Sequence, residues 1–335
     1  MLPEFLLKEK HEINMKSPST MTHKLLFNIL RKILVISDRV SSRSMRILYE
    51  GAKNETTFPH YLAVAVIVKN EGPYMYEWLE YHRMLGVTKF YVYDNESSDN
   101  LKVLLRAYID AGIVEYKYFP GKLKQLRAYR HALRKARHQT RWVAFIDVDE
   151  FIIVKTDKAL VGFLKEIEEF PGIEINWVVY GSGGKKYKEE ELVIERFKDH
   201  SDENFSVNRH VKSIVNPRMV RSVGVHSSKY LNNCNPLDGN GNESSVDFLD
   251  RSPTYGLIQI NHYFSKSQEE FLDKIKKGRV FVIDDLTQEH FDLHDRNEIK
   301  NDPIMDSMIP QLKKRLALLK PINLSSIKKI PTESH

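Results

Sequence analysis

Short apolar runs alternate with amphipathic segments along most of the chain. The first run, Leu62 to Val68, is nearly continuous and rich in β-branched residues, as expected of a strand that is buried on both faces. Pro73 favours the first turn of a helix after this run, and Gly86 ends the helical spacing of apolar residues. A second strand is expected at 90–93. The pattern predicts a β–α–β unit.

The same alternation continues to residue 148. Asp99 is predicted to cap a helix that closes at Gly112, and strands are expected at 113–118 and 142–148. A basic helix at 122–138 lies between these strands. We expect this helix to bury its apolar positions, which are Leu123, Leu126, Leu133 and Ala136.

Polar residues follow three of these strands. Strands that alternate with helices indicate a mainly parallel sheet with right-handed crossovers, so the predicted fold class is α/β. Ligands of such sheets bind at the carboxyl ends of the strands. Asn70 and Glu71 follow the first strand, Asp94 follows the second, and Asp147 and Asp149 follow the fourth. The sequence therefore predicts that three polar clusters converge on one crevice.

The second half of the chain has a less regular pattern. Strands are expected at 175–180, 192–197, 211–220 and 257–263, and helices at 266–277 and 310–319. Residues 232–250 are polar and rich in Gly and Asn, which is typical of a loop. The predicted organisation is a basic helical N-terminal extension (1–58), an α/β catalytic domain (59–285) and a helical C-terminal extension (286–335).

The N-terminal extension has the pattern of a basic amphipathic helix. Leu26, Ile29 and Ile33 recur at helical spacing among lysines and arginines. Such a helix lies on an anionic membrane, or it packs on the catalytic domain or a second subunit, and the sequence favours neither. No stretch approaches the roughly 20 apolar residues that span a bilayer. We expect a cytoplasmic protein; peripheral contact with the inner face of the plasma membrane and homo-oligomerisation stay open.

Composition narrows the picture only slightly. A chain of 335 residues, of which 41% are hydrophobic, is long enough to bury a substantial core. The formal charge of +6 favours an anionic partner without choosing among nucleic acid, a membrane surface and a phosphorylated substrate. The single cysteine, Cys234, excludes an intramolecular disulfide and a Cys-based zinc site, and it fits a reducing compartment.

Asp147 and Asp149 are the main chemical signal. If the strand persists this far, period-two alternation places both carboxylates on one face. They then repel each other unless a cation or hydrogen-bond donors lie beside them. Oxygen ligands suit Mg²⁺ or Mn²⁺, which usually arrive with substrate phosphates. The structural alternative is an acidic strand end that caps a neighbouring helix or pairs with lysines.

Two other interpretations of this segment are weaker. An apolar strand that ends in Asp-Glu resembles a Walker B strand, but the chain has no Gly-x-x-x-x-Gly-Lys-Ser/Thr loop to bind the nucleotide. A phosphatase-type Asp-x-Asp motif requires Thr or Val where Phe151 stands.

Further residues are suited to the same site. Asp94 is placed to accept hydrogen bonds from the base or ribose of a nucleotide. His262 ends an apolar strand, and His226 follows a Val-Gly-Val segment. Taken alone, each histidine is more often a structural residue than a metal ligand. Four cations would neutralise a diphosphate or simply be solvated: Lys212, Lys266, Lys274 and Arg279.

A larger set of motifs resembles a known group of enzymes. Lys69-Asn70-Glu71 is followed by Glu77-Trp-Leu-Glu-Tyr-His82, by Leu85-Gly-Val87 and by Tyr91-Val-Tyr-Asp-Asn-Glu-Ser-Ser-Asp99. The segments 142–151, 212–215, 225–226 and 261–271, with Lys274 and 277–279, complete the set. Over about residues 62 to 280, this combination resembles the family 2 and family 92-like glycosyltransferases. It is far more specific than any one motif.

The resemblance implies a GT-A fold, which is a Rossmann-like, mostly parallel sheet flanked by helices. It also implies an inverting transfer from a nucleoside diphosphate sugar, for which we expect UDP as the nucleotide. By the family pattern, Asp94 contacts the nucleotide, Asp147 the ribose or sugar, and Asp149 the metal bound to the diphosphate. His262 is the first candidate for a later metal ligand and His226 the second. The remaining positions assigned to donor binding are Asn70, Glu71, Gln125 and Lys212.

The reaction chemistry fits these residues. The diphosphate gains charge as the glycosidic bond breaks, so Mn²⁺ or Mg²⁺ stabilises the transition state more than the ground state. Inversion also needs a base for the acceptor hydroxyl. Better-known family 2 members place an acidic pair at a helix start beyond the metal motif, and this chain has no clean equivalent. The candidates left open are Glu150, Asp199, Asp202, Asp238 and Glu243.

We therefore predict a metal-dependent glycosyltransferase that acts on a glycan or lipid-linked acceptor in surface polysaccharide biosynthesis, without a nucleic acid partner. One alternative is a metal-dependent nucleotidyl or phosphoryl transferase. Another is a non-catalytic carbohydrate-binding protein on the same fold.

Overall fold

The computed structural model describes residues 58–277 and 286–319. All of them belong to one compact unit, which begins at Asn54. The predicted N-terminal helix therefore lies outside the described residues, as do Arg279 and 320–335. Within the described part of the chain, none of the helices combines the length and apolarity that a membrane crossing requires.

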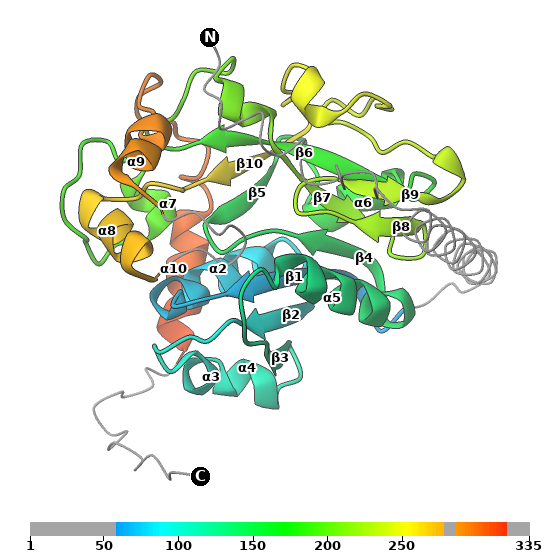
Figure 1. Ribbon diagram of the computed structural model, residues 1–335, viewed down its shortest axis with the longest axis horizontal. Helices are drawn as coiled ribbons and strands as arrows, with labels where there is room; N and C mark the ends of the chain where they lie inside the picture. The colour runs from blue at the N-terminus through cyan, green and yellow to red at the C-terminus, as the bar shows by residue number, and fades with distance from the viewer. Residues whose placement is uncertain (1–57, 278–285, 320–335) are drawn as a thin grey trace, which may run out of the picture. The chain divides into compact units, whose positions relative to one another are not determined.

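An eight-stranded sheet forms the centre of the unit (Figure 1), and its strand order is β3-β2-β1-β4-β7-β6-β10-β5. Four strands are parallel neighbours: β1 (His60–Val68), β2 (Lys89–Asp94), β3 (Val114–Tyr118) and β4 (Thr140–Phe145). The others are β5 (Glu150–Val154), β6 (Gly172–Val179), β7 (Val211–Val215) and β10 (Ile258–His262). β7 runs antiparallel to both β4 and β6, whereas β10 is parallel to β6. A large, mostly parallel sheet confirms the predicted α/β class.

The remaining elements connect or cover these strands. The helices are α2 (Gly72–Met84), α3 (Leu101–Leu104), α4 (Arg106–Asp110), α5 (Gln125–Gln139), α6 (Leu160–Glu166), α7 (Val193–Arg196), α8 (Gln268–Lys277), α9 (Gln288–His294) and α10 (Ile309–Leu318). Short 3₁₀ segments are η3 (Ser206–Arg209), η4 (Leu231–Asn233) and η5 (Phe248–Asp250), and β8 (Val220–Val223) pairs with β9 (Ser228–Tyr230).

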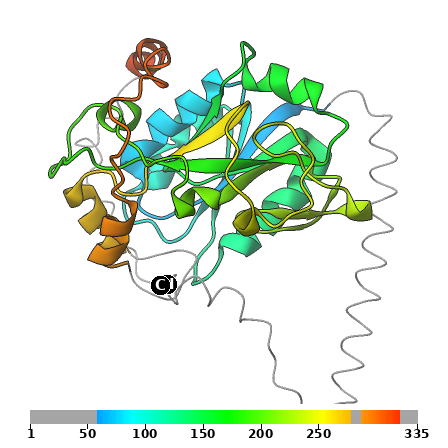
Figure 2. The same ribbon diagram turned by 90° about the horizontal axis from the view of Figure 1, so that it is seen from above.

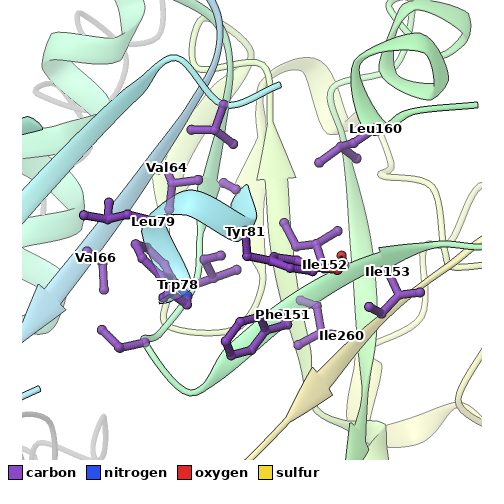
Figure 3. Close-up of a cluster of buried hydrophobic side chains, with 14 of the residues drawn as sticks. Val64, Val66, Trp78, Leu79, Tyr81, Phe151, Ile152, Ile153, Leu160 and Ile260 are labelled. Carbon is purple, nitrogen blue, oxygen red and sulfur yellow. Dashed lines mark hydrogen bonds between the residues drawn. The ribbon is translucent and has the colours of Figure 1, made fainter. Parts of the chain in front are cut away.

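Successive side chains of β1 enter two different cores, which explains its continuous apolar run. Val64 and Val66 pack in one core with Trp78 and Leu79 of α2 (Figure 3). Ala63, Ala65 and Ile67 pack in the other core with the apolar side of α5. Helices therefore cover both faces of the sheet (Figure 2). A strand buried on both faces has no solvent side that would require polar residues.

Asp99 does not cap the helix that follows it. Asn100, with a φ of 56°, occupies the N-cap position and makes no side-chain cap bond. The Asp99 carboxylate instead accepts a hydrogen bond from the backbone N–H of Gly72, at 2.7 Å. It thus holds the start of α2, and the helix predicted behind it is divided into α3 and α4.

Leu123 is also placed differently from the prediction. The basic helix begins at Gln125, two residues beyond Leu123. Leu123 has a φ of 54° in the preceding loop, and 47% of its surface is exposed. It therefore lies outside the core that Leu133 and Ala136 of α5 enter.

One predicted strand of the second half is wrong, and another is too long. Residues 192–197 contain α7 because the Glu77 carboxylate accepts hydrogen bonds from the N–H groups of Val193 and Ile194, at 2.9 and 3.1 Å. The segment 211–220 is divided into β7 and the start of β8 by a turn at Asn216, whose backbone carbonyl accepts from Met219 N. β5, α6 and α9 were not predicted.

Two helices lie in the predicted C-terminal extension. α10 packs against α2, and Arg315 Nε donates to Glu80 Oε2 at 2.7 Å. α9 packs against α8 through Phe291 and Phe271, whose ring centroids are 5.2 Å apart.

Candidate active site

Asp147 and Asp149 lie in a turn rather than on a strand. β4 ends at Phe145, and β5 begins at Glu150. The alternation argument for a shared face therefore does not apply. Glu150 holds the turn, because its carboxylate accepts from Asp147 N at 2.9 Å. The Glu150 side chain is fully buried, and burial raises the pKa of its carboxyl well above the ordinary value. Glu150 is thus a structural residue rather than a base within reach of an acceptor.

Three donors fix the Asp147 carboxylate. Lys212 Nζ lies 2.6 Å from one oxygen, while Gln125 Nε2 and Tyr129 Oη lie 3.1 and 3.2 Å from the other. Lys212 is only 1% exposed, and its Nζ is also 3.6 Å from Glu150 Oε1. Burial by itself would lower the pKa of Lys212, but Asp147 and Glu150 raise it above the ordinary value. The predicted residues Gln125, Asp147 and Lys212 thus form one cluster.

Asp149 forms a second cluster with residues from the C-terminal half. Lys274 Nζ of α8 donates to Asp149 Oδ2 at 2.7 Å, and His262 Nε2 at the end of β10 is 3.8 Å from Oδ1. Burial alone would raise the pKa of the Asp149 carboxyl, but Lys274 and His262 hold it well below its usual range. Burial lowers the pKa of His262, which therefore favours the neutral ring that a metal ion requires.

Asp149 and His262 fit a cation that arrives with a phosphate ligand. Carboxylate oxygen and imidazole nitrogen are suitable ligands for Mn²⁺, and Mg²⁺ or Mn²⁺ often bind through one or two protein carboxylates plus substrate phosphates. The ring of His226, the second candidate ligand, lies against Trp177 with centroids 5.5 Å apart, and the ring of His262 lies against the same residue at 4.1 Å. Among residues 58–277 and 286–319, no three His, Cys, Asp or Glu side chains are grouped as a metal site.

Asp94 at the end of β2, with Asn70 and Glu71 directly after β1, form the third group. Asp94 Oδ1 accepts from Ser97 N at 2.8 Å, and Tyr116 Oη donates to Oδ2. Asn70 Oδ1 accepts from Ser98 N at 2.6 Å, and Glu71 immediately precedes α2.

Asp94 of this third group lies apart from Asp147. β1 separates β2 from β4, so Asp94 and Asp147 stand about two strand spacings, or roughly 10 Å, apart. Asp94 and Asp147 therefore share one edge of the sheet without direct contact. That spacing suits an elongated ligand better than a single metal ion held by Asp94, Asp147 and Asp149.

A cleft of about 320 Å³ joins the second group, through Lys274, to the third group, through Asn70. Its lining residues are Asn70, Pro73, Tyr74, Lys188, Glu270, Asp273, Lys274 and Lys276. Lys266 lies beside it, with its Nζ 4.3 Å from the centroid of the Tyr74 ring and a left-handed φ of 52°. Lysines around an open cleft are suited to bind phosphate oxygens.

Sequence reasoning missed three aromatic residues of the site. Tyr129 stands four residues after Gln125, so helical spacing predicts that both side chains lie on one face of α5. Tyr116, which donates to Asp94, belongs to none of the motifs that stand out in the sequence. Trp177 lies between His262 and His210 and stands in an otherwise ordinary apolar strand.

The fold and these groups define an α/β protein with acidic and lysine-rich groups at the carboxyl edge of its sheet. Proteins of this class that bind phosphorylated ligands hold them at the same edge. The chain belongs to glycosyltransferase family 92, whose family profile matches residues 63–294. Its large, mostly parallel sheet flanked by helices is the architecture that the sequence resemblance implied.

Individual relatives are more distant. A glycosyltransferase family 92 protein of Ricinus communis is 25% identical over 244 residues, which are 71% of this chain and 42% of that protein. A galactan β-1,4-galactosyltransferase of Arabidopsis thaliana is 24% identical over 201 residues, or 55% of this chain and 40% of that enzyme. The chain thus spans about two fifths of the length of these relatives. The crystal structure of Staphylococcus aureus TarS 1–349 is 15% identical, covers 48% of each chain and has a TM-score of 0.33.

Proposed function

We propose that this chain transfers a sugar from a nucleoside diphosphate sugar to a glycan acceptor with the help of a divalent cation. The observation that carries the proposal is the placement of Asp149. Its carboxylate meets His262 on one side, and on the other it meets Lys274, which also lines the lysine-rich cleft.

In this proposal the donor lies along the carboxyl edge of the sheet. The Asn70–Asp94 group binds the nucleotide end. Asp147 meets the ribose or sugar hydroxyls, since a third of its side chain is exposed and three donors fix its orientation. The lysines of the cleft neutralise the diphosphate. Holding a flexible donor at several points places its anomeric carbon in one position for attack.

Asp149 and His262 would hold the cation. Bound there, Mn²⁺ or Mg²⁺ would stabilise the charge that develops on the departing diphosphate. Lys274 Nζ would be released from Asp149 and would be close enough to contribute a second positive charge. Lys212 has a different role, because it is buried and holds the Asp147 carboxylate in its orientation.

The resemblance to inverting enzymes extends the proposal to inversion at the anomeric carbon. The galactan galactosyltransferase relatives make UDP-galactose the first donor to test. They also support a glycan acceptor and a role in polysaccharide assembly.

The test measures UDP release from UDP-galactose by the wild-type chain, with Mn²⁺ and with EDTA, against a panel of neutral oligosaccharides. We expect cation-dependent UDP release, and NMR of the product should show a β-linked sugar from the α-linked donor. If UDP-galactose is inactive, other nucleoside diphosphate sugars are screened by thermal shift. Transfer of labelled phosphate would contradict the proposal in favour of a phosphoryl transferase. Sugar binding without turnover of any donor would favour a non-catalytic protein.

A further inference from the structure

Three partly exposed rings gather beside the candidate active site. His210 follows η3, His226 lies in the turn between β8 and β9, and Phe248 begins η5. Their centroids are 4.9 Å apart for His210 and His226, 5.9 Å for His210 and Phe248, and 5.7 Å for His226 and Phe248. Three separate segments therefore contribute to one ring cluster.

The ring cluster is continuous with Asp149. Behind it lies Trp177, which is only 8% exposed and stacks on His210 with centroids 5.0 Å apart and an interplanar angle of 21°. Trp177 also packs against His262, at 4.1 Å, and His262 lies 3.8 Å from the Asp149 carboxylate. The lysine-rich cleft reaches Asp149 through the other carboxylate oxygen, which Lys274 contacts. Asp149 thus stands between the cleft and the rings.

Main-chain contacts hold the rings in place. Nδ1 of His210 lies 2.9 Å from Val207 O, and Nδ1 of His226 lies 3.3 Å from Val211 O. A carbonyl oxygen only accepts, so Nδ1 of each ring carries the hydrogen. In the neutral His226 ring, Nε2 is then a hydrogen-bond acceptor.

The short segment that carries Phe248 is tied down as well. Asp247 Oδ1 accepts from Leu249 N at 3.0 Å, and Arg209, the neighbour of His210, donates to Leu249 O at 3.1 Å. On the other side, Arg251 forms a buried ion pair with Glu174 at 2.6 Å. Phe248 is therefore a positioned ring rather than a random surface aromatic.

We propose that Phe248, His210 and His226 form a subsite for one sugar ring of the acceptor. This inference rests on the proposed function. A pyranose ring has an apolar C–H face, which packs on an aromatic ring, and a rim of hydroxyl groups, which donate to acceptors such as imidazole nitrogen. The diphosphate is assigned to the lysine-rich cleft, so the rings on the opposite side of Asp149 are left for the sugar that attacks. The expected acceptor is a neutral glycan rather than a phosphorylated one.

Three variants of the full chain test the subsite. Phe248→Ala removes the ring, Phe248→Leu keeps an apolar side chain without a flat face, and Val246→Ala is the matched control, because Val246 is 52% exposed on the same loop. The acceptors are β-1,4-galactobiose, lactose, cellobiose and maltose. We expect the acceptor KM to rise about tenfold in Phe248→Ala, which corresponds to about 1.4 kcal/mol, and by less in Phe248→Leu, because the leucine keeps apolar contact but has no flat face. UDP-galactose binding and thermal midpoint should match those of Val246→Ala.

The outcomes separate this inference from the proposed function. An unchanged acceptor KM in Phe248→Ala would overturn the subsite and leave the transferase intact. Donor hydrolysis without transfer to any of the four disaccharides would also overturn it. If no donor is bound or hydrolysed, the proposed function fails, and calorimetric binding of the disaccharides decides the subsite. Weaker binding by Phe248→Ala than by Val246→Ala would then support it, and equal or absent binding would refute it.

Discussion

Lys274 Nζ lies 2.7 Å from Asp149 Oδ2, so an ammonium group already neutralises the carboxylate that we assign to the metal. The two residues come from the turn after β4 and from α8, which are 125 positions apart in the chain. A cation that binds Asp149 must compete with this ion pair. The released lysine would then be able to bind the negatively charged diphosphate. Metal and donor binding should therefore be coupled.

Replacing Lys274 should separate the two binding events. In Lys274→Met, we expect Mn²⁺ alone to bind more tightly, because Asp149 has lost its competing partner. We expect UDP to bind about tenfold more weakly, because the diphosphate has lost a positive charge. Calorimetric titration with MnCl₂ and with UDP measures both. Lys313→Met is the control, since Lys313 pairs with Glu195 on the surface. Parallel changes in both affinities would contradict this coupling.

Asp149→Asn should abolish the reaction while leaving the chain folded. An amide is a poor metal ligand compared with a carboxylate, so we expect kcat/KM to fall by at least about 100-fold, or roughly 3 kcal/mol of transition-state stabilisation. Steady-state UDP release measures this, with circular dichroism as the check on folding. The control is Asp110→Asn, which removes a surface carboxylate paired with Arg106. Full activity of Asp149→Asn would refute the assignment of Asp149 to the metal.

Lys212 should matter for stability as much as for activity. It is buried between Asp147 and Glu150, and Lys212→Met leaves both carboxylates without their cation. We expect a loss of about 3–5 kcal/mol in the free energy of unfolding at neutral pH, as for other broken buried pairs. Part of this loss should be recovered at lower pH, because burial raises the pKa of the Glu150 carboxyl, which then takes up a proton in place of its cation. Urea unfolding at pH 5 and pH 8 measures it, and an equal loss at both pH values would contradict the role of charge.

Glu77 should make the protein less stable as the pH rises. Burial raises the pKa of its carboxyl from 4.5 to about 7. The folded chain therefore binds a proton more tightly than the unfolded chain, and stability falls between these two pH values, by about 3 kcal/mol at most. In Glu77→Gln this part of the pH dependence should vanish. Urea unfolding from pH 4.5 to 8 measures the stability of Glu77→Gln, of the wild type and of the surface variant Glu169→Gln. If the free energy of unfolding of Glu77→Gln fell with pH as steeply as that of the wild type, the prediction would be contradicted.

Local sequence pattern predicted the N-terminal half of the sheet well. β1, β2, β3 and α2 lie within one or two residues of their predicted positions. The apolar spacing within each of these elements records which face is buried, whichever segment packs against it. The strand of residues 192–197 failed because its conformation is set from elsewhere. Glu77, 116 positions earlier, supplies the acceptor that starts α7.

The residues of the candidate site were largely predicted, but their partners were not. Motifs around Asp94, Asp147 and Asp149 are visible in the chain because polar residues at the ends of apolar strands stand out. Trp177 gives no such signal, since an aromatic residue in a buried strand is ordinary until its neighbours are known.

The sequence alone determined the α/β class, the order of the first strands and the carboxylates at their ends, because each depends on local periodicity. Only the tertiary structure decided that Asp147 is fixed by Lys212, that Asp149 faces His262 and Lys274, and that three rings gather beside them. These pairings join segments far apart in the chain. Each buried charge needs a partner that offsets its loss of hydration, and no pattern within a single segment records which distant residue supplies that partner.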